Sequence, residues 1–183
     1  MSRNKLKKLI FLALCCDLGL FAKRLISPVT NIITDALRIP GGISSSFSLM
    51  FVVIAAMLTH GKGCGTIMGA VQSVLAVAMG MTGSMGALAP IGYIVPGILI
   101  DGCVFLGRYF SWEEQFTMML ANLLAAFAAA LSANLIVFRL RGVLLALYLT
   151  VSMSSGTLCG LLAYRLYLRL KTVIHFQEKG ETA

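Results

Sequence analysis

The stretch 114-EQFTMMLANLLAAFAAALSANLIVF-138 decides the fold, because its only charged residue is Glu114, at the first position. A helix that crosses a lipid bilayer needs about 20 predominantly apolar residues in succession. The next charged residue along the chain is Arg139, so the apolar stretch is longer than this requirement. It therefore predicts a membrane-spanning helix over residues 114–138.

Further apolar segments flank this stretch on both sides. The whole chain of 183 residues is 58% hydrophobic and only 12% charged, whereas soluble domains carry about 25% charged residues. That composition leaves too little polar surface to cover a water-soluble globule. We expect an all-α membrane protein with one integral-membrane domain over residues 1–183, a compact bundle of about six transmembrane helices. The predicted helices span 9–26, 47–59, 65–81, 90–106, 114–138 and 142–170.

A short helix is predicted between the first two of these segments. Ser27 can cap a helix, and Pro28 suits its first position. The apolar residues that follow recur at helical spacing and share one face: Val29, Ile32, Ile33, Ala36 and Leu37. This amphipathic helix is too short to cross a bilayer, and we expect it to lie on the membrane surface or to cover a cavity.

The positive charges indicate how the chain is placed in the membrane. The formal net charge is +8, but the cations sit at the ends of apolar segments and not on a nucleic-acid-binding module. Nucleic acid is therefore not an expected partner. The first apolar run continues through Asp17 without a small-x-small cleavage site, so we expect it to be retained as a helix. The excess of Lys and Arg predicts a multi-pass protein of the cell membrane with both termini in the cytoplasm.

Small residues recur at every fourth position in three of the predicted helices. This spacing lets helix backbones approach closely. It predicts a compact bundle or, equally, contact with a partner subunit. The residues concerned are Gly65, Gly69 and Ser73; Ala125, Ala129 and Ala133; and Ser152, Gly156 and Gly160.

Enzymatic chemistry finds little support in the sequence. The glycine-rich turn from His60 to Gly65 lacks the spacing of a phosphate-binding P-loop. His60 and His175 have no second ligand at metal-binding spacing, and the cysteines form no C-x-x-C pair. We therefore expect no enzyme, no cofactor and no bound metal.

Polar residues inside the apolar segments are the candidates for ligand binding. A carboxylate within a spanning helix costs several kcal/mol unless it is paired or wetted, in the range of about 2.5–3.5 kcal/mol on insertion scales. Asp101, next to the proline kink at Pro96, is the expected centre of a substrate pocket. Gln72 fits a pocket or an interhelical hydrogen bond equally well. We place Tyr93 in the same pocket, and expect Ser84, Asn31 and Asp35 to lie nearer its mouth.

Several of these residues fall in motifs that resemble a known family. The chain is similar to substrate-binding S components of energy-coupling factor (ECF) vitamin transporters, and one region resembles the YkoE-type branch, linked to thiamine and its hydroxymethylpyrimidine precursor. In that branch an acid occupies a position similar to Asp101. The chain differs from the family in its first helix. S components typically carry an Ala-x-x-x-Ala pattern there that docks the coupling subunit, whereas here Ala13 is followed four residues on by Asp17. The matching motifs are Ile39-Pro40-Gly41-Gly42, Gly69-x-x-Gln72, Gly83-Ser84-Met85-Gly86 and Tyr93-x-x-Pro96-Gly97-x-x-x-Asp101.

The resemblance implies a receptor for a small vitamin-like nutrient that is captured from outside the cell. Its partners would be an ECF coupling transmembrane subunit and ATPase subunits on separate chains, within the lipid bilayer. A cationic or amine-bearing ring would suit Asp101. Two other functions stay open at this point: a stand-alone ion-coupled secondary transporter, and a non-transport membrane scaffold or assembly protein.

Overall fold

The computed structural model describes residues 3–36, 43–59, 61, 63–80 and 83–173. Within these ranges the protein is entirely helical and contains no strand, which confirms the predicted all-α bundle. A 3-10 segment, η1, and a π-helical segment, η2, accompany the α-helices. The elements are α1 (Arg3–Ala36), α2 (Ile43–Thr59), α3 (Cys64–Ala78), η1 (Gly83–Leu88), α4 (Ala89–Tyr109), α5 (Glu114–Ala133), η2 (Asn134–Phe138) and α6 (Val143–Val173).

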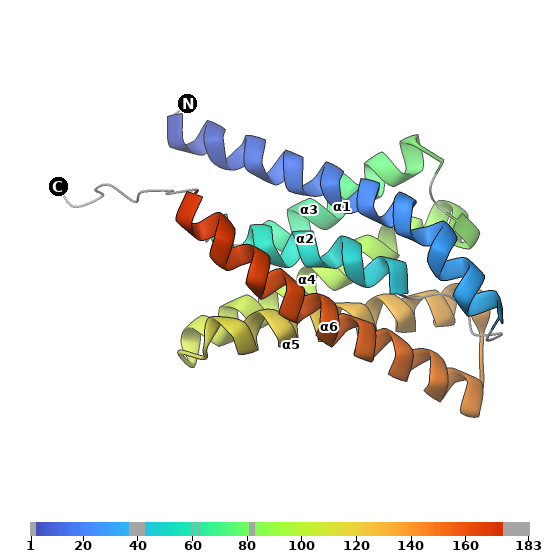
Figure 1. Ribbon diagram of the computed structural model, residues 1–183. Helices are drawn as coiled ribbons and strands as arrows, with labels where there is room; N and C mark the ends of the chain where they lie inside the picture. Colours follow the sequence, from blue (N-terminus) through green and yellow to red (C-terminus); the bar gives the residue numbers. More distant parts are fainter. Residues whose placement is uncertain (1–2, 37–42, 60, 62, 81–82, 174–183) are drawn as a thin grey trace.

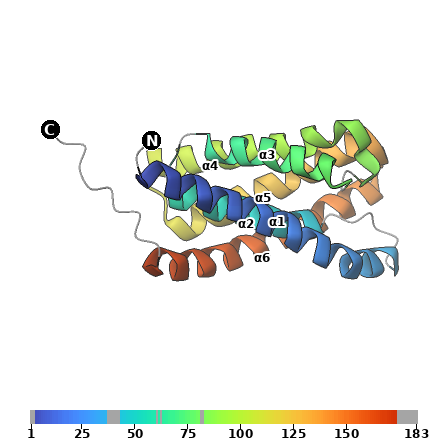
Figure 2. The same ribbon diagram turned by 90° about the horizontal axis from the view of Figure 1, so that it is seen from above.

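The helices run alternately up and down the bundle. The N-terminal end of α1 and the C-terminal end of α6 lie at the same end of the bundle, and we call this the proximal end (Figure 1). The opposite, distal end holds η1 and the beginning of α4 (Figures 1 and 2). Helix α2 lies between α1 and α6 and also packs against α3, α4 and α5. It is therefore the central helix of the bundle.

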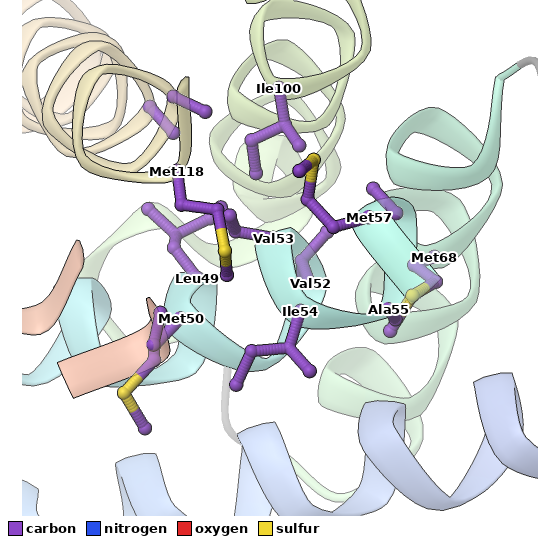
Figure 3. Close-up of a cluster of buried hydrophobic side chains, with 14 of the residues drawn as sticks. Leu49, Met50, Val52, Val53, Ile54, Ala55, Met57, Met68, Ile100 and Met118 are labelled. Atoms are coloured by element: carbon purple, nitrogen blue, oxygen red, sulfur yellow. The ribbon is translucent and has the colours of Figure 1, made fainter. Parts of the chain in front are cut away.

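The core is built around α2. Residues 52–59 are all buried, whichever way they point. A helix that is apolar on every side is expected to be enclosed by other helices, and Val52, Val53 and Ile54 face different neighbours (Figure 3). Met68 of α3, Ile100 of α4 and Met118 of α5 complete the same cluster. One continuous hydrophobic core thus joins the helices.

The outside of the bundle is also apolar. Helix α6 exposes leucines along its length, including Leu158 at 63% and Leu162 at 52% of their surface. Three helical segments of the described chain are long and apolar enough to cross a membrane, namely Ala89–Tyr109, Glu114–Phe138 and Val143–Thr172. These features are those of a membrane protein. Helices α2 and α3 are apolar but shorter.

Close backbone approach between helices confirms the small-residue prediction. A Cβ added to Gly97 of α4 would lie 2.5 Å from the carbonyl oxygen of Gly65 in α3. A Cβ at Gly69 would lie 2.5 Å from the carbonyl oxygen of Tyr93. In α6, a Cβ at Gly160 would come within 2.7 Å of the Met119 Cα atom in α5. Glycine is therefore required where α3 meets α4 and where α6 meets α5.

The structure corrects the prediction of a separate amphipathic helix. The described part of that segment is helical, but it continues α1 without a break, and Pro28 lies inside the helix. Proline has no N–H to give to the preceding turn, so the carbonyl oxygen of Arg24, four residues earlier, has no helical donor. The Thr30 hydroxyl donates to the carbonyl oxygens of Ile26 at 3.1 Å and Ser27 at 3.0 Å, in the turn that contains the proline. The Ser27–Pro28 pair therefore resembles a helix start but lies within a continuous helix.

The remaining predicted boundaries differ by a few residues. Helix α2 begins four residues before the predicted 47, α3 ends before the predicted 81, and α4 extends past the predicted 106. The predicted helix 114–138 is divided into α5 and the π-helical η2. Between the predicted helices 65–81 and 90–106 the chain forms η1, in which Gly86 adopts a positive φ of 52°. Such a φ favours glycine.

Candidate substrate-binding site

The described side chains of the predicted pocket fall into two groups. Gln72 and Tyr93 both contact α1, through Cys16 and Lys23 respectively. Asp101 instead binds the first turn of α3, toward the proximal end. The side chains of three further predicted residues lie outside the described part of the structure: Ser84, Asn31 and Asp35.

Asp101 closes the N-terminal end of α3. Its Oδ1 atom accepts a hydrogen bond from the Gly65 amide at 2.7 Å, and its Oδ2 atom accepts one from the Thr66 amide at 2.7 Å. The Thr66 hydroxyl also donates to Oδ2, at 2.6 Å. The first amides of a helix have no partner within it, and negative charge is favoured there. Because Gly63 supplies no side-chain cap, a carboxylate from α4 replaces it.

Gln72 belongs to a polar cluster between α1, α2 and α3. Its side chain is 1% exposed, and its Nε2 atom donates to the Cys16 carbonyl oxygen over a long 3.4 Å. The cluster surrounds Gly19, where an added Cβ would lie 2.8 Å from Gln72 Nε2 and 3.3 Å from Ser48 Oγ. The Ser48 hydroxyl is buried and has no hydrogen-bond partner among the described residues. Gly19 thus makes room for two polar side chains whose hydrogen-bonding capacity is only partly used.

Tyr93 is paired with a lysine from α1. Lys23 Nζ donates to the Tyr93 hydroxyl oxygen at 2.9 Å and lies 4.5 Å from the centre of the ring. The nitrogen is thus held by the phenol oxygen and also benefits from the electron-rich ring. Lys23 is half-buried and Tyr93 is buried. Among the described carboxylates, none lies within 4.0 Å of Lys23 Nζ, since the one ion pair found there joins Lys171 to Glu114.

The Tyr93 ring rests on an apolar base that α1, α3 and α4 build together. Leu20, Ala76 and Ala89 are buried against it, with Met85 of η1 and Leu75 packed at the edge. The alanines leave space for the broad ring, and the backbone contact at Gly69 fixes the height of Tyr93 along α3. The Lys23 cation and the Tyr93 side chain are therefore held by helices toward the distal end of the bundle.

The chemistry of this site suits binding more than catalysis. Lys23 offers a positive charge, and Tyr93 offers a hydroxyl and a flat ring. Gln72 offers an amide further along α1, beside Cys16. From Cys16 to Lys23 is seven residues of α1, which corresponds to about 10 Å along the helix. In the described part of the chain, no group of three His, Cys, Asp or Glu side chains is placed to hold a metal ion.

Sequence reasoning missed the lysine and the serine of this site. It treated Lys23 as one of several cations that set the orientation, and it did not single out Ser48. The available signal was the position of Lys23 within the apolar run 18-LGLFAKRLI-26. A cation there is costly without a partner, but the identity of the partner depends on which side chains of other helices lie within reach of α1 in the folded bundle.

Comparison of the chain with protein-family models, with curated proteins and with solved structures found no match. The functional argument therefore rests on the geometry of the chain's own residues.

Proposed function

We propose that the protein is a multi-pass integral membrane protein that serves as the substrate-binding subunit of a nutrient importer, an S component of the ECF type. On this proposal all six α-helices cross or enter the bilayer, and both termini face the cytoplasm. The distal end then faces the outside of the cell, where a nutrient is captured. The excess of Lys and Arg at the proximal end supports this orientation.

The observation that carries the proposal is the Lys23–Tyr93 pair. A lysine within an apolar helix costs about 2.5–3.5 kcal/mol on insertion scales, and such residues usually pair with one another or mark substrate paths. Lys23 has a neutral phenol as its described partner, and no described carboxylate neutralises it. Its charge is therefore available to a ligand.

The chemistry of the pair narrows the class of ligand. A carboxylate or another strong hydrogen-bond acceptor would complement Lys23, and a flat ring would stack beside Tyr93. Gln72 and the unpartnered Ser48 hydroxyl offer further polar contacts deeper in the bundle. We therefore propose a small ring-bearing nutrient with an acceptor group. Asp101 does not argue for a cationic ring, because both of its oxygens already bind α3.

The energy source would lie outside this chain. The sequence has no P-loop with which to cradle the phosphates of ATP. On the proposal, a coupling transmembrane subunit and ATPases on separate chains drive transport, and this subunit supplies specificity.

A thermal-shift screen of the purified protein tests the proposal. The panel contains vitamins and their precursors, with and without a carboxylate, and includes thiamine and hydroxymethylpyrimidine. A ligand that binds only the folded state stabilises it by about 2.7 kcal/mol at roughly a hundredfold excess over Kd. We expect a saturable shift with one compound or a close group of compounds.

Two variants connect any shift to the site. Lys23→Met keeps the length of the side chain and removes the charge, and Tyr93→Phe removes the hydroxyl. Both are expected to weaken binding, whereas Lys7→Met, an exposed lysine near the beginning of α1, is the matched control. The proposal fails if no compound shifts the folded protein, or if Lys23→Met binds the ligand as tightly as the control.

A further inference from the structure

A long groove runs along the outer side of α6. It encloses about 760 Å³ and lies where α6 meets Phe47 of α2 and Gln115 of α5. Half of its lining residues on α6 are leucines, including Leu158, Leu161 and Leu162. A second hollow of about 660 Å³ adjoins it, because the two share Leu162, Arg165 and Leu168.

The part of the groove between Ser155 and Arg165 has the length of one bilayer leaflet, and the lining continues to Leu168. It begins at Ser155, which is buried and bonded to Ser46 of α2. Ten residues of helix separate Ser155 from Arg165, which corresponds to about 15 Å. The hydrocarbon core of a bilayer is about 30 Å thick, so one leaflet provides about 15 Å. An acyl chain that lay along the leucines would therefore end near Arg165.

Two arginines stand at the proximal end of this apolar path. Arg165 lines both hollows and Arg169, one turn further, lines the second. Both are exposed, and neither forms an ion pair with a described carboxylate. Lys171 is different, because Glu114 binds it at 2.7 Å. The groove therefore combines an apolar body with a positive end that no described carboxylate neutralises.

We propose that this groove is a binding site for one anionic phospholipid. The phosphate binds Arg165 and Arg169, and the acyl chains lie along Leu158, Leu161 and Leu162. Basic pockets between apolar helices are well suited to anionic headgroups. A purely apolar partner helix would offer no acceptor to the two arginines, whereas a phosphate headgroup offers several. This site is separate from the Lys23–Tyr93 site and does not depend on it.

Fluorescence quenching in vesicles tests the site directly. Leu162 is half exposed, so Leu162→Trp places an indole in the groove, and Trp112→Phe removes the native tryptophan. This protein is reconstituted into phosphatidylcholine vesicles that contain increasing fractions of brominated phosphatidylglycerol. Each arginine near a membrane surface favours an anionic lipid by roughly a factor of five. A parallel series of vesicles carries brominated phosphatidylcholine instead. From the two series we expect the groove to prefer phosphatidylglycerol over phosphatidylcholine by at least about tenfold.

The charge variants decide whether the arginines cause that preference. Arg165→Gln together with Arg169→Gln should reduce it to near one. Arg141→Gln, an exposed arginine at the distal end, should leave it unchanged. The inference is overturned if quenching follows the bulk fraction of brominated phosphatidylglycerol, or if the double variant keeps the preference. It is equally overturned if neither brominated lipid reaches the indole, because a protein segment would then occupy the groove.

Discussion

The hydrogen bonds between Asp101 and the beginning of α3 predict how much stability the protein loses when this side chain is changed. Asp101→Ala leaves the amides of Gly65 and Thr66 without an acceptor, and also the Thr66 hydroxyl. Loss of a helix cap costs about 0.5–2 kcal/mol, and a hydrogen bond to a charged group contributes about 1.5–3 kcal/mol. Because these two contributions overlap, we expect Asp101→Ala to lower the free energy of unfolding by about 3 kcal/mol.

Asp101→Asn separates the charge from the hydrogen bonds. Asparagine keeps one acceptor oxygen, but its NH₂ group takes the place of the other carboxylate oxygen and cannot accept a hydrogen bond from α3. One amide of α3 therefore keeps its partner and the other loses it, which should cost about 1–2 kcal/mol. The two variants together predict a graded effect, with Asn between Asp and Ala.

Hydrogen exchange locates the effect. For Asp101→Ala, a loss of about 3 kcal/mol corresponds to roughly 140-fold faster exchange, and it should concentrate in the peptide that contains Gly65 and Thr66. Global stability is followed by unfolding in mixed detergent micelles. Asp17→Asn is the control, since it removes an exposed carboxylate of α1. If Asp101→Ala exchanged at these amides like the control, the capping role would be refuted.

Three further variants and labels probe the packing of the bundle. Gly97→Ala forces a Cβ to within 2.5 Å of the Gly65 carbonyl oxygen and should cost about 1–3 kcal/mol of unfolding free energy. Gly102→Ala in the same helix meets nothing within 4 Å and should be neutral or stabilising by up to about 1 kcal/mol; equal melting temperatures for the two would contradict the close approach of α3 and α4. Glu114→Gln weakens the ion pair with Lys171, in which the Glu114 and Lys171 side chains are 42% and 53% exposed. Unfolding measurements should therefore show a change in unfolding free energy below about 1 kcal/mol. A larger loss would mean that the ion pair is less accessible to water. The five cysteines are free and buried, so a water-soluble maleimide should label them only after unfolding in dodecyl sulfate; rapid labelling of the folded protein would show that a thiol is accessible.

The helices could be predicted from the sequence because membrane helices leave a strong local signal. The apolar segments, among them the stretch 114–138, predict the order of the helices. The glycines at 65, 69, 156 and 160 also indicated which helix faces come close. These features depend on local composition and on helical spacing, and both can be read without knowledge of the neighbouring helices.

The continuity of α1 could not be predicted in the same way. Ser27 and Pro28 form a good helix start, and a proline inside a helix normally breaks it. Tertiary contacts can outweigh this local preference, and here α1 packs against α2 and α3. Those contacts involve residues distant in the sequence, so the local pattern alone indicates a helix start.

The roles of the polar residues depended on contacts across the bundle. Asp101 is an isolated acid in the sequence, and only the approach of α3 at Gly97 shows that its oxygens cap a neighbouring helix. Lys23 and Tyr93 are 70 positions apart, and their hydrogen bond forms because the long Lys23 side chain of α1 reaches Tyr93 on α4 in the folded bundle. The sequence therefore identified Tyr93 and Gln72 as candidates but did not identify the cation that accompanies them.

Equilibrium binding of the compound found by the thermal screen tests the central claim most directly. Calorimetry on the purified protein would compare the native chain with Lys23→Met and Asp101→Asn, each at a temperature where it is folded. We predict that Lys23→Met raises Kd by at least about tenfold, equivalent to about 1.4 kcal/mol, and that Asp101→Asn leaves Kd unchanged. The opposite result, with Asp101→Asn losing the ligand and Lys23→Met retaining it, would contradict a binding site at the Lys23–Tyr93 pair.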